Sequence, residues 1–153
     1  MAKELPDLNT IFPDVAAALG NLSNTLRPYY EKLGLELTLI ELICLRSSQL
    51  NGCARCISVH VPKALKAGVP QRKIDILPAW REAGDLYTTQ EKAALELTEQ
   101  LVGLPKGRRN SAASEAALTF FTPEQLAAIE WCIIAIDANN RVSIASHHPP
   151  RNY

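Results

Sequence analysis

The sequence contains few glycines and few cysteines, and each scarcity excludes a class of protein. Only seven glycines occur among 153 residues. None are clustered as in the phosphate-binding loops and dinucleotide fingerprints of nucleotide-dependent enzymes. We therefore expect no bound cofactor, and electrons for any redox reaction would come from thiols. The four cysteines are too few for a disulfide-rich scaffold in a chain of this length.

The sequence also lacks an excess of charge of one sign and any long hydrophobic run. Sixteen basic residues balance sixteen acidic ones, so no overall field directs the chain to nucleic acid or to a membrane surface. The apolar stretches LIELICL and WCIIAI are far shorter than the roughly 20 residues that a membrane span needs. The N-terminus, MAKELPDLNT, has no apolar core of a secretory signal, so we expect a cytoplasmic protein. The basic segment 106–109 is interpreted as a solvated loop.

No internal repeat or strand-like alternation is present, and the start and stop signals along the chain are those of helices. We predict a single all-α domain over residues 1–153, with the following elements. In the first half, helices are expected from about 15 to near Pro28, from 37 to 50 with a stop at Asn51-Gly52, and from near Cys53 to Ala67-Gly68. A fourth helix is expected from Pro70 through Trp80 to Gly84, unless Pro78 ends it early. The last two run from Thr88 to Val102, after a capping box, and from Thr122 to about Ala138, with a loop over 104–113 between them. The last helix is apolar nearly all round, which predicts that part of it contacts another subunit.

The stretch NGCARCISVH holds the pattern C-x-x-C-x-x-x-H. On a helix, Cys53, Cys56 and His60 fall at roughly 0°, 300° and 340°, within one narrow arc. Cys53 would lie at the first turn, where free backbone N–H groups and the helix dipole favour a thiolate. His60 can carry a proton near neutral pH. The placement suits a redox-reactive thiol pair served by a histidine.

Other interpretations of the cysteine pair are a structural disulfide and a zinc site. A permanent disulfide is disfavoured in a reducing cytoplasm. Zinc needs a fourth ligand, which could come from His147, His148, another cysteine or a carboxylate elsewhere, although the two histidines are interpreted first as a frayed tail. Haem attachment is excluded because Ile57, not histidine, follows the second cysteine.

Glu41 lies inside the apolar run LIELICL. It either completes a capping box with Thr38 or, if the helix begins earlier, lies beyond the cap and faces His60. An antiparallel pair of helices joined at Asn51-Gly52 would bring Glu41 and His60 nearly level, where Glu41 could act as a base. Pro62 is expected to kink or break the helix after His60.

The two remaining cysteines and the two tryptophans have apolar neighbours. Cys44 and Cys132 are assigned to the core, where a free cysteine behaves as a small hydrophobe. Trp80 and Trp131 are assigned to the core or to an interface.

Residues 41–60, ELICLRSSQLNGCARCISVH, resemble the alkylhydroperoxidase D-like (AhpD-like) branch of the carboxymuconolactone decarboxylase superfamily. Further similar segments are Ala67-Gly68, AWREA at 79–83, Thr88-x-x-Glu91 with the following KAAL, and Asn140-Arg141. The resemblance is strongest over about 37–102, weaker over 122–150, and fades over the first thirty residues. It places the core of the AhpD-like domain at about 35–140.

The resemblance implies an oligomeric antioxidant protein, a dimer, trimer or hexamer, that reduces hydroperoxides through a dithiol–disulfide cycle and is itself reduced by an external dithiol protein. By position, Cys56 matches the thiol that attacks peroxide and Cys53 the resolving thiol. Glu41 and His60 match the relay that deprotonates Cys56. Arg55 stands where the well-characterised peroxidases have histidine, and its charge could lower a neighbouring thiol pKa. The cysteine pair argues against lactone decarboxylation. The alternative functions are a non-enzymatic dithiol redox sensor and a zinc-stabilised interaction module.

Overall fold

The computed structural model describes residues 5–104 and 111–152, and within these ranges it contains helices and turns but no strand. The prediction of an all-α protein is therefore confirmed. The elements are α1 (Leu8–Ile11), α2 (Pro13–Lys32), α3 (Leu37–Asn51), α4 (Ala54–Ala67), α5 (Gln71–Ile76), the 3-10 helices η1 (Leu77–Glu82) and η2 (Gly84–Leu86), α6 (Thr89–Val102), α7 (Ala112–Ala117) and α8 (Pro123–Ala145). In this part of the chain, no helix is both long and apolar enough to cross a membrane. The basic segment 106–109 lies outside the described residues, and the single-domain boundary stays a prediction.

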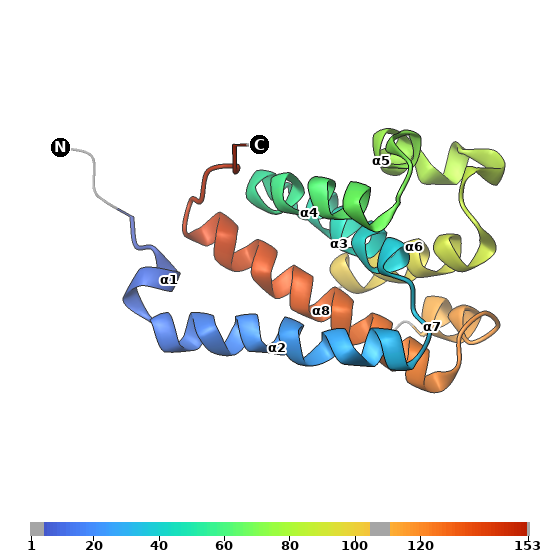
Figure 1. The fold of residues 1–153 in the computed structure, drawn as a ribbon, viewed down its shortest axis with the longest axis horizontal. Coiled ribbons are helices and arrows are strands. Elements are labelled where there is room, and N and C mark those ends of the chain that lie inside the picture. The colour runs from blue at the N-terminus through green and yellow to red at the C-terminus, as the bar shows by residue number, and fades with distance from the viewer. Residues whose placement is uncertain (1–4, 105–110, 153) are drawn as a thin grey trace.

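Helix α3 lies at the centre of the fold and packs against α4, α6 and α8. One side of it places Leu42 and Leu45 in an apolar cluster with α4, η1 and α6. The other side places Ile40 and Ile43 in a larger cluster with α2 and α8. Figure 1 shows α2 and α4 on either side of α8, with α8 running in the opposite direction to both. Helix α4, which carries Cys56 and His60 of the cysteine motif, packs against α3 and α8.

The helix ends near the motif follow the sequence signals. Gly52 and Gly68 have left-handed backbones, with φ of 68° and 102°, and they end α3 and α4 at the predicted places. Thr88 with Glu91, and Thr122 with Gln125, form the capping boxes that begin α6 and α8.

Three helix boundaries differ from the predictions, and a fourth follows the alternative that was left open for it. Helix α2 continues through Pro28 to Lys32, because the carbonyl that loses its partner lies on an exposed surface and can bond water. The helix after Pro70 ends at Ile76, and a 3-10 helix follows with Pro78 in its first turn, which confirms the alternative of an early end near Pro78. Helix α7 begins at Ala112, inside a predicted loop. Helix α8 extends to Ala145 rather than Ala138, since no glycine or proline interrupts it.

Glu99 joins α6 to α3 and η1 through a group of charged and polar contacts. Its Oε1 accepts hydrogen bonds from Arg46 Nε at 2.8 Å and from Trp80 Nε1 at 2.8 Å. Arg81 also pairs with Glu99. Burial would raise the pKa of Glu99, but the hydrogen bonds from Trp80, Arg81 and Arg46 outweigh it and hold the pKa below its ordinary value. Trp80 is buried, as predicted.

Replacing Glu99 with glutamine is expected to lower the free energy of unfolding by about 2 kcal/mol at pH 7, because Arg46 loses a largely buried partner. The folded pKa of Glu99 is depressed, so its stabilisation is complete above the unfolded value of about 4.3 and is lost as the pH falls through the folded pKa. The difference between wild type and variant should shrink below about pH 4. Urea unfolding at several pH values measures it. A difference that stays constant down to pH 3 would contradict this role.

Candidate functional site

The hairpin of α3 and α4 assembles the predicted site. Cys53 and Cys56 are joined by a disulfide, with Cα atoms 5.3 Å apart. His60 Nδ1 lies 2.7 Å from Glu41 Oε2. The expectation that the tight turn at Gly52 brings Glu41 level with His60 is therefore confirmed. A disulfide that closes so short a loop restricts the unfolded chain little, contributing only about 2 kcal/mol, so its stabilising effect is at the low end for a disulfide.

Glu41 does not form the capping box with Thr38. The N-cap of α3 is Glu36, and the Thr38 hydroxyl donates to the Glu36 carboxylate instead. Glu41 thus lies in the second turn of α3, with 15% of its side chain exposed, and His60 is its partner. A carboxylate only accepts hydrogen bonds, so the proton between the pair resides on Nδ1 when the ring is neutral. The other ring nitrogen, Nε2, is then free to accept a proton.

Pro62 does not break α4, which is continuous from Ala54 to Ala67. Proline removes one backbone hydrogen bond, and the carbonyl that loses it belongs to Ser58. Pro62 itself is exposed on the outer side of the helix. His60 therefore keeps its helical position relative to Cys56, one turn away.

A cavity of about 790 Å³ opens between α2, α3, α4 and α8. Cys56, His60, Glu41 and Arg55 all line it. Cys53 does not: it is 1% exposed and lines a separate hollow of about 240 Å³ beside the end of α8. The two sulfur-bearing residues of the motif therefore face different spaces, and Cys56 is the one beside the histidine–carboxylate pair.

Cys53 is the N-cap of α4 rather than its first helical residue. Its sulfur accepts a hydrogen bond from the Cys56 backbone N–H at 3.2 Å. A thiolate at this sulfur would be stabilised by that N–H and by the positive end of the helix. The predicted position at the first turn is confirmed, and the stabilised sulfur is that of Cys53.

The core cysteines lie on the wall of the same cavity. Cys44 and Cys132 are buried, as predicted, and their sulfurs are 3.9 Å apart. The hydrogen bond with Cys132, together with burial, raises the pKa of the Cys44 thiol well above its ordinary value. Burial, with Cys132 nearby, also raises the pKa of Tyr30. Cys44 and Tyr30 therefore stay protonated at neutral pH, unlike the thiolate that peroxide chemistry requires.

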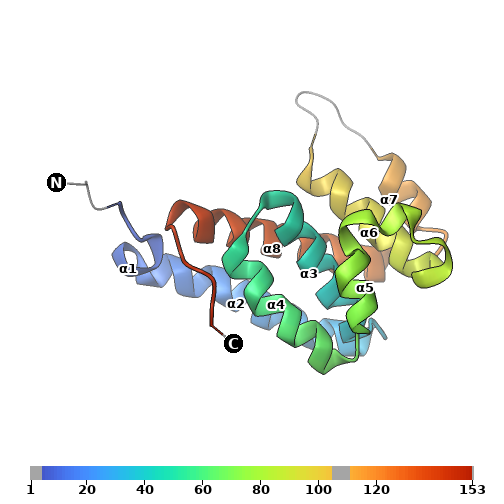
Figure 2. The ribbon, with the colours of Figure 1, turned by 90° about the horizontal axis from the view of Figure 1, so that it is seen from above.

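The C-terminal segment is not a frayed tail. His148 Nε2 lies 3.3 Å from Asp7 Oδ2, and its Nδ1 lies 3.3 Å from the Ser143 hydroxyl. Arg55 donates to the Pro149 carbonyl, and the Arg151 N–H donates to the Ser58 hydroxyl. Figure 2 shows this segment passing beside α4. The tail contacts the first two turns of α4, close to the turn that joins α4 to α3. Sequence spacing could not reveal this contact.

Asn140 is a fully buried residue whose structural role the sequence did not show. Its carbonyl oxygen accepts from Asn51 Nδ2 at 3.0 Å and from the Ser47 hydroxyl at 3.3 Å. Its amide donates to the Ser48 hydroxyl at 3.1 Å. One amide therefore ties α8 to the last turn of α3, directly before the cysteine motif.

Replacing Asn140 with leucine is expected to destabilise the protein by about 3 kcal/mol, because the buried Ser47 hydroxyl loses its acceptor and the buried Ser48 hydroxyl loses a donor. Thermal unfolding of the wild type and variant measures the change. Asn139→Leu is the matched control, since within the described residues the Asn139 amide bonds the Ala135 carbonyl of its own helix. Equal destabilisation by both substitutions would contradict the role given to Asn140.

Among the described residues, no three side chains of His, Cys, Asp or Glu come together in an arrangement that could hold a metal ion. His148, one of the residues considered for a zinc site, contacts Asp7 and Ser143 instead.

Comparison with known proteins places these features in a family. Residues 13–100 match the carboxymuconolactone decarboxylase family. The uncharacterized protein YdfG of Bacillus subtilis is 38% identical over 117 residues, which cover 76% of this chain and 79% of that protein. A crystal structure from Agrobacterium tumefaciens, of a protein of unknown function described as a candidate antioxidant defence protein AhpD, superposes with a TM-score of 0.87. It is 28% identical and the alignment covers 99% of this chain and 100% of that one. The family match thus begins earlier in the chain than the resemblance read from the sequence.

Proposed function

This chain belongs to the AhpD-like branch of the carboxymuconolactone decarboxylase family, and on that premise we propose that it is a thiol-dependent peroxidase. The reduced protein converts a hydroperoxide to an alcohol and becomes oxidised at Cys53 and Cys56. The observation that carries the proposal is the 2.7 Å contact between His60 and Glu41 on the wall of the cavity that Cys56 also lines.

The first step forms a sulfur–oxygen bond. The Cys56 thiolate attacks the terminal oxygen of the hydroperoxide, the O–O bond breaks, and the departing alkoxide takes a proton to leave as an alcohol. Cys56 becomes a sulfenic acid. The Cys53 sulfur then attacks the Cys56 sulfur, a disulfide forms and water departs. Two thiols lose two electrons, and the peroxide gains both.

His60 and Glu41 move the protons in this cycle. His60 Nε2 can take the proton of the Cys56 thiol and deliver it to the alkoxide. The Glu41 carboxylate holds Nδ1 and stabilises the imidazolium that forms between these two transfers. Arg55, on the same cavity wall, adds a positive charge that favours the Cys56 thiolate. Arg55 cannot itself accept a proton.

The Cys53–Cys56 disulfide is reduced from the side of the cavity. An external dithiol protein, which we expect to meet this protein in the cytoplasm, attacks the Cys56 sulfur from the cavity. Cys53 departs as the thiolate because its sulfur already accepts the Cys56 N–H and a stabilised thiolate is the better leaving group. The second thiol of the reductant then attacks the mixed disulfide and restores free Cys56.

The test is a thiol titration. Fully reduced protein is treated with one equivalent of a neutral alkyl hydroperoxide, and its thiols are counted after unfolding. We expect two of the four cysteines to be consumed and peptide mapping to join Cys53 to Cys56. Turnover with an excess of a small dithiol establishes catalysis. Oxidation without turnover would favour the redox sensor, and stoichiometric zinc in the purified protein would favour the zinc-stabilised module.

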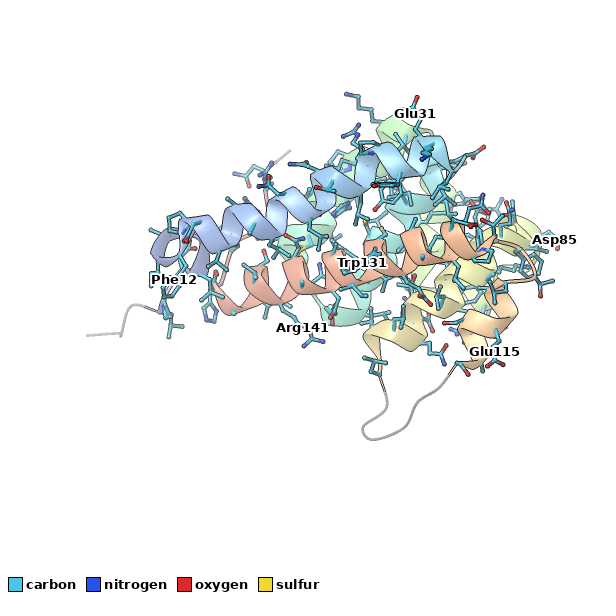
Figure 3. All side chains as sticks on the ribbon, turned by 90° about the horizontal axis from the view of Figure 1, so that it is seen from below. Phe12, Glu31, Asp85, Glu115, Trp131 and Arg141 are labelled. Carbon is cyan, nitrogen blue, oxygen red and sulfur yellow. A yellow bond between two sulfur atoms is a disulfide. The ribbon has the colours of Figure 1, made fainter. Side chains whose placement is uncertain are left out.

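We also propose a homo-oligomer. Trp131 and Ile134 are 50% and 49% exposed on one side of α8, and Figure 3 shows Trp131 on that helix. Large exposed apolar side chains in adjacent turns favour contact with a second subunit. Trp131→Glu should then lower the mass measured by sedimentation equilibrium, and a wild-type mass of one chain would exclude the oligomer.

A further inference from the structure

We infer that the cavity selects long-chain hydroperoxides that carry a carboxylate, with the peroxide at Cys56 and the carboxylate at the far end of α4. The inference rests on the proposed function for its chemistry, but the binding site that it describes can be tested without turnover. Two observations carry it, namely the distribution of charge along the cavity and the distance between its chemically different ends.

Positively charged side chains outnumber negatively charged ones on the cavity wall. Four cations line it, Arg27, Arg55, Lys63 and Lys66, against one carboxylate, that of Glu41. Glu41 is already paired with His60. Arg55 is also engaged, because its Nη1 donates to the Pro149 carbonyl.

The remaining cations form what we call the basic end, Arg27, Lys63 and Lys66. In the described part of the chain, no acidic side chain pairs with any of the three. All three residues are exposed, so their side chains are hydrated and able to receive an anion. An anionic group on a ligand therefore finds its partners at the basic end.

The basic end lies at a definite distance from the reactive sulfur. Lys63 and Lys66 are seven and ten residues beyond Cys56 on the continuous helix α4, which corresponds to about 10 and 15 Å at 1.5 Å per residue. Both lie within about 80° of the direction of Cys56 around the helix, at 100° per residue. Arg27 approaches from the later part of α2, which runs in the same direction as α4 (Figure 1).

Apolar side chains from four helices also line the cavity. Leu19 of α2, Ile40 of α3, Val59 of α4 and Ile136 of α8 contribute to the wall. A hydrocarbon chain would bury its surface there, with a gain of about 0.8 kcal/mol for each CH₂ group. An extended chain advances about 1.2 Å per bond. The distance from Cys56 to the basic end therefore fits a peroxide about eight to twelve carbons from a carboxylate.

The test compares a fatty acid hydroperoxide of this spacing with its methyl ester, which differs only in the missing charge. We expect kcat/KM to be about tenfold higher for the acid at low salt, since each exposed cation contributes modestly. The preference should weaken as salt is added. The double variant Lys63→Gln/Lys66→Gln should remove most of the preference for the acid. Its kcat/KM for the ester should stay within about twofold of the wild-type value. Arg72→Gln/Lys92→Gln, on α5 and α6 outside the cavity, makes the same change of charge and should preserve it.

Equilibrium binding separates this inference from the proposed function. Calorimetry with the unperoxidised fatty acid needs no reaction, and binding that Lys63→Gln/Lys66→Gln weakens about tenfold supports the site even if no hydroperoxide is reduced. Equal turnover of acid and ester, with no effect of the double variant, overturns the inference while leaving the peroxidase intact. Inorganic phosphate that displaces the fatty acid at equal concentration would also overturn it, because a simple anion patch would then explain the binding.

Discussion

Cys56→Ser is expected to reduce hydroperoxide turnover on the order of 10³-fold or more, since the nucleophile itself is removed. A serine hydroxyl is not ionised at neutral pH and does not form the sulfenic acid. Cys56 lines the large cavity, whereas Cys53 is buried beside a separate hollow. The substitution should therefore abolish even a single turnover. Stopped-flow thiol consumption and steady-state peroxide loss measure the two effects.

Cys53→Ser is the matched control for this prediction. It removes a sulfur from the same disulfide, yet it should leave the first chemical step intact. We expect one equivalent of peroxide to yield a stable sulfenic acid at Cys56, detectable by a sulfenic-acid-selective reagent, and no steady-state turnover. If Cys53→Ser prevents the first oxidation and Cys56→Ser allows it, the two cysteines have exchanged roles.

Glu41→Gln is expected to slow the oxidation of Cys56 about 10²-fold at pH 7, within the range that general acid–base groups contribute. Glutamine preserves the size of the side chain and an oxygen near His60 Nδ1, but it removes the charge that stabilises the imidazolium. His60 would then accept the thiol proton less readily. The rate of thiol consumption at a fixed hydroperoxide concentration measures the loss.

The pH dependence of the Cys56 oxidation rate in Glu41→Gln distinguishes a proton relay through Glu41 and His60 from a purely structural contact between them. Above about pH 9, a thiol with an ordinary pKa of about 8.5 is mostly ionised without a general base. The deficit of Glu41→Gln should therefore narrow as the pH rises from 7 to 9. Glu31→Gln, at the exposed end of α2 (Figure 3), makes the same chemical change away from the cavity and should alter the rate less than twofold. A deficit that is constant with pH, or shared by Glu31→Gln, would contradict the relay.

The C-terminal contacts show why some structure could not be predicted. The pairing of His148 with Asp7 joins residues 141 positions apart, and the Asn140 network joins α8 to α3 across about 90 positions. Local patterns report propensity and periodicity over a turn or two of helix. They contain no information about which distant polar groups meet, because that depends on how the helices cross.

Local sequence signals specify the helices that carry the site and the order in which they follow one another. The αL stops at Gly52 and Gly68, the capping boxes at Thr88 and Thr122, and the spacing of Cys53, Cys56 and His60 are all local effects, which act between neighbouring residues regardless of the rest of the chain. Three features come from the packing of the helices alone. Glu41 contacts His60 rather than the helix cap, Cys56 and Cys53 face different spaces, and the basic end lies on the cavity of the cysteine site. These outcomes depend on the packing of α2, α3, α4 and α8 against one another, and burial of apolar surface across distant segments fixes that packing.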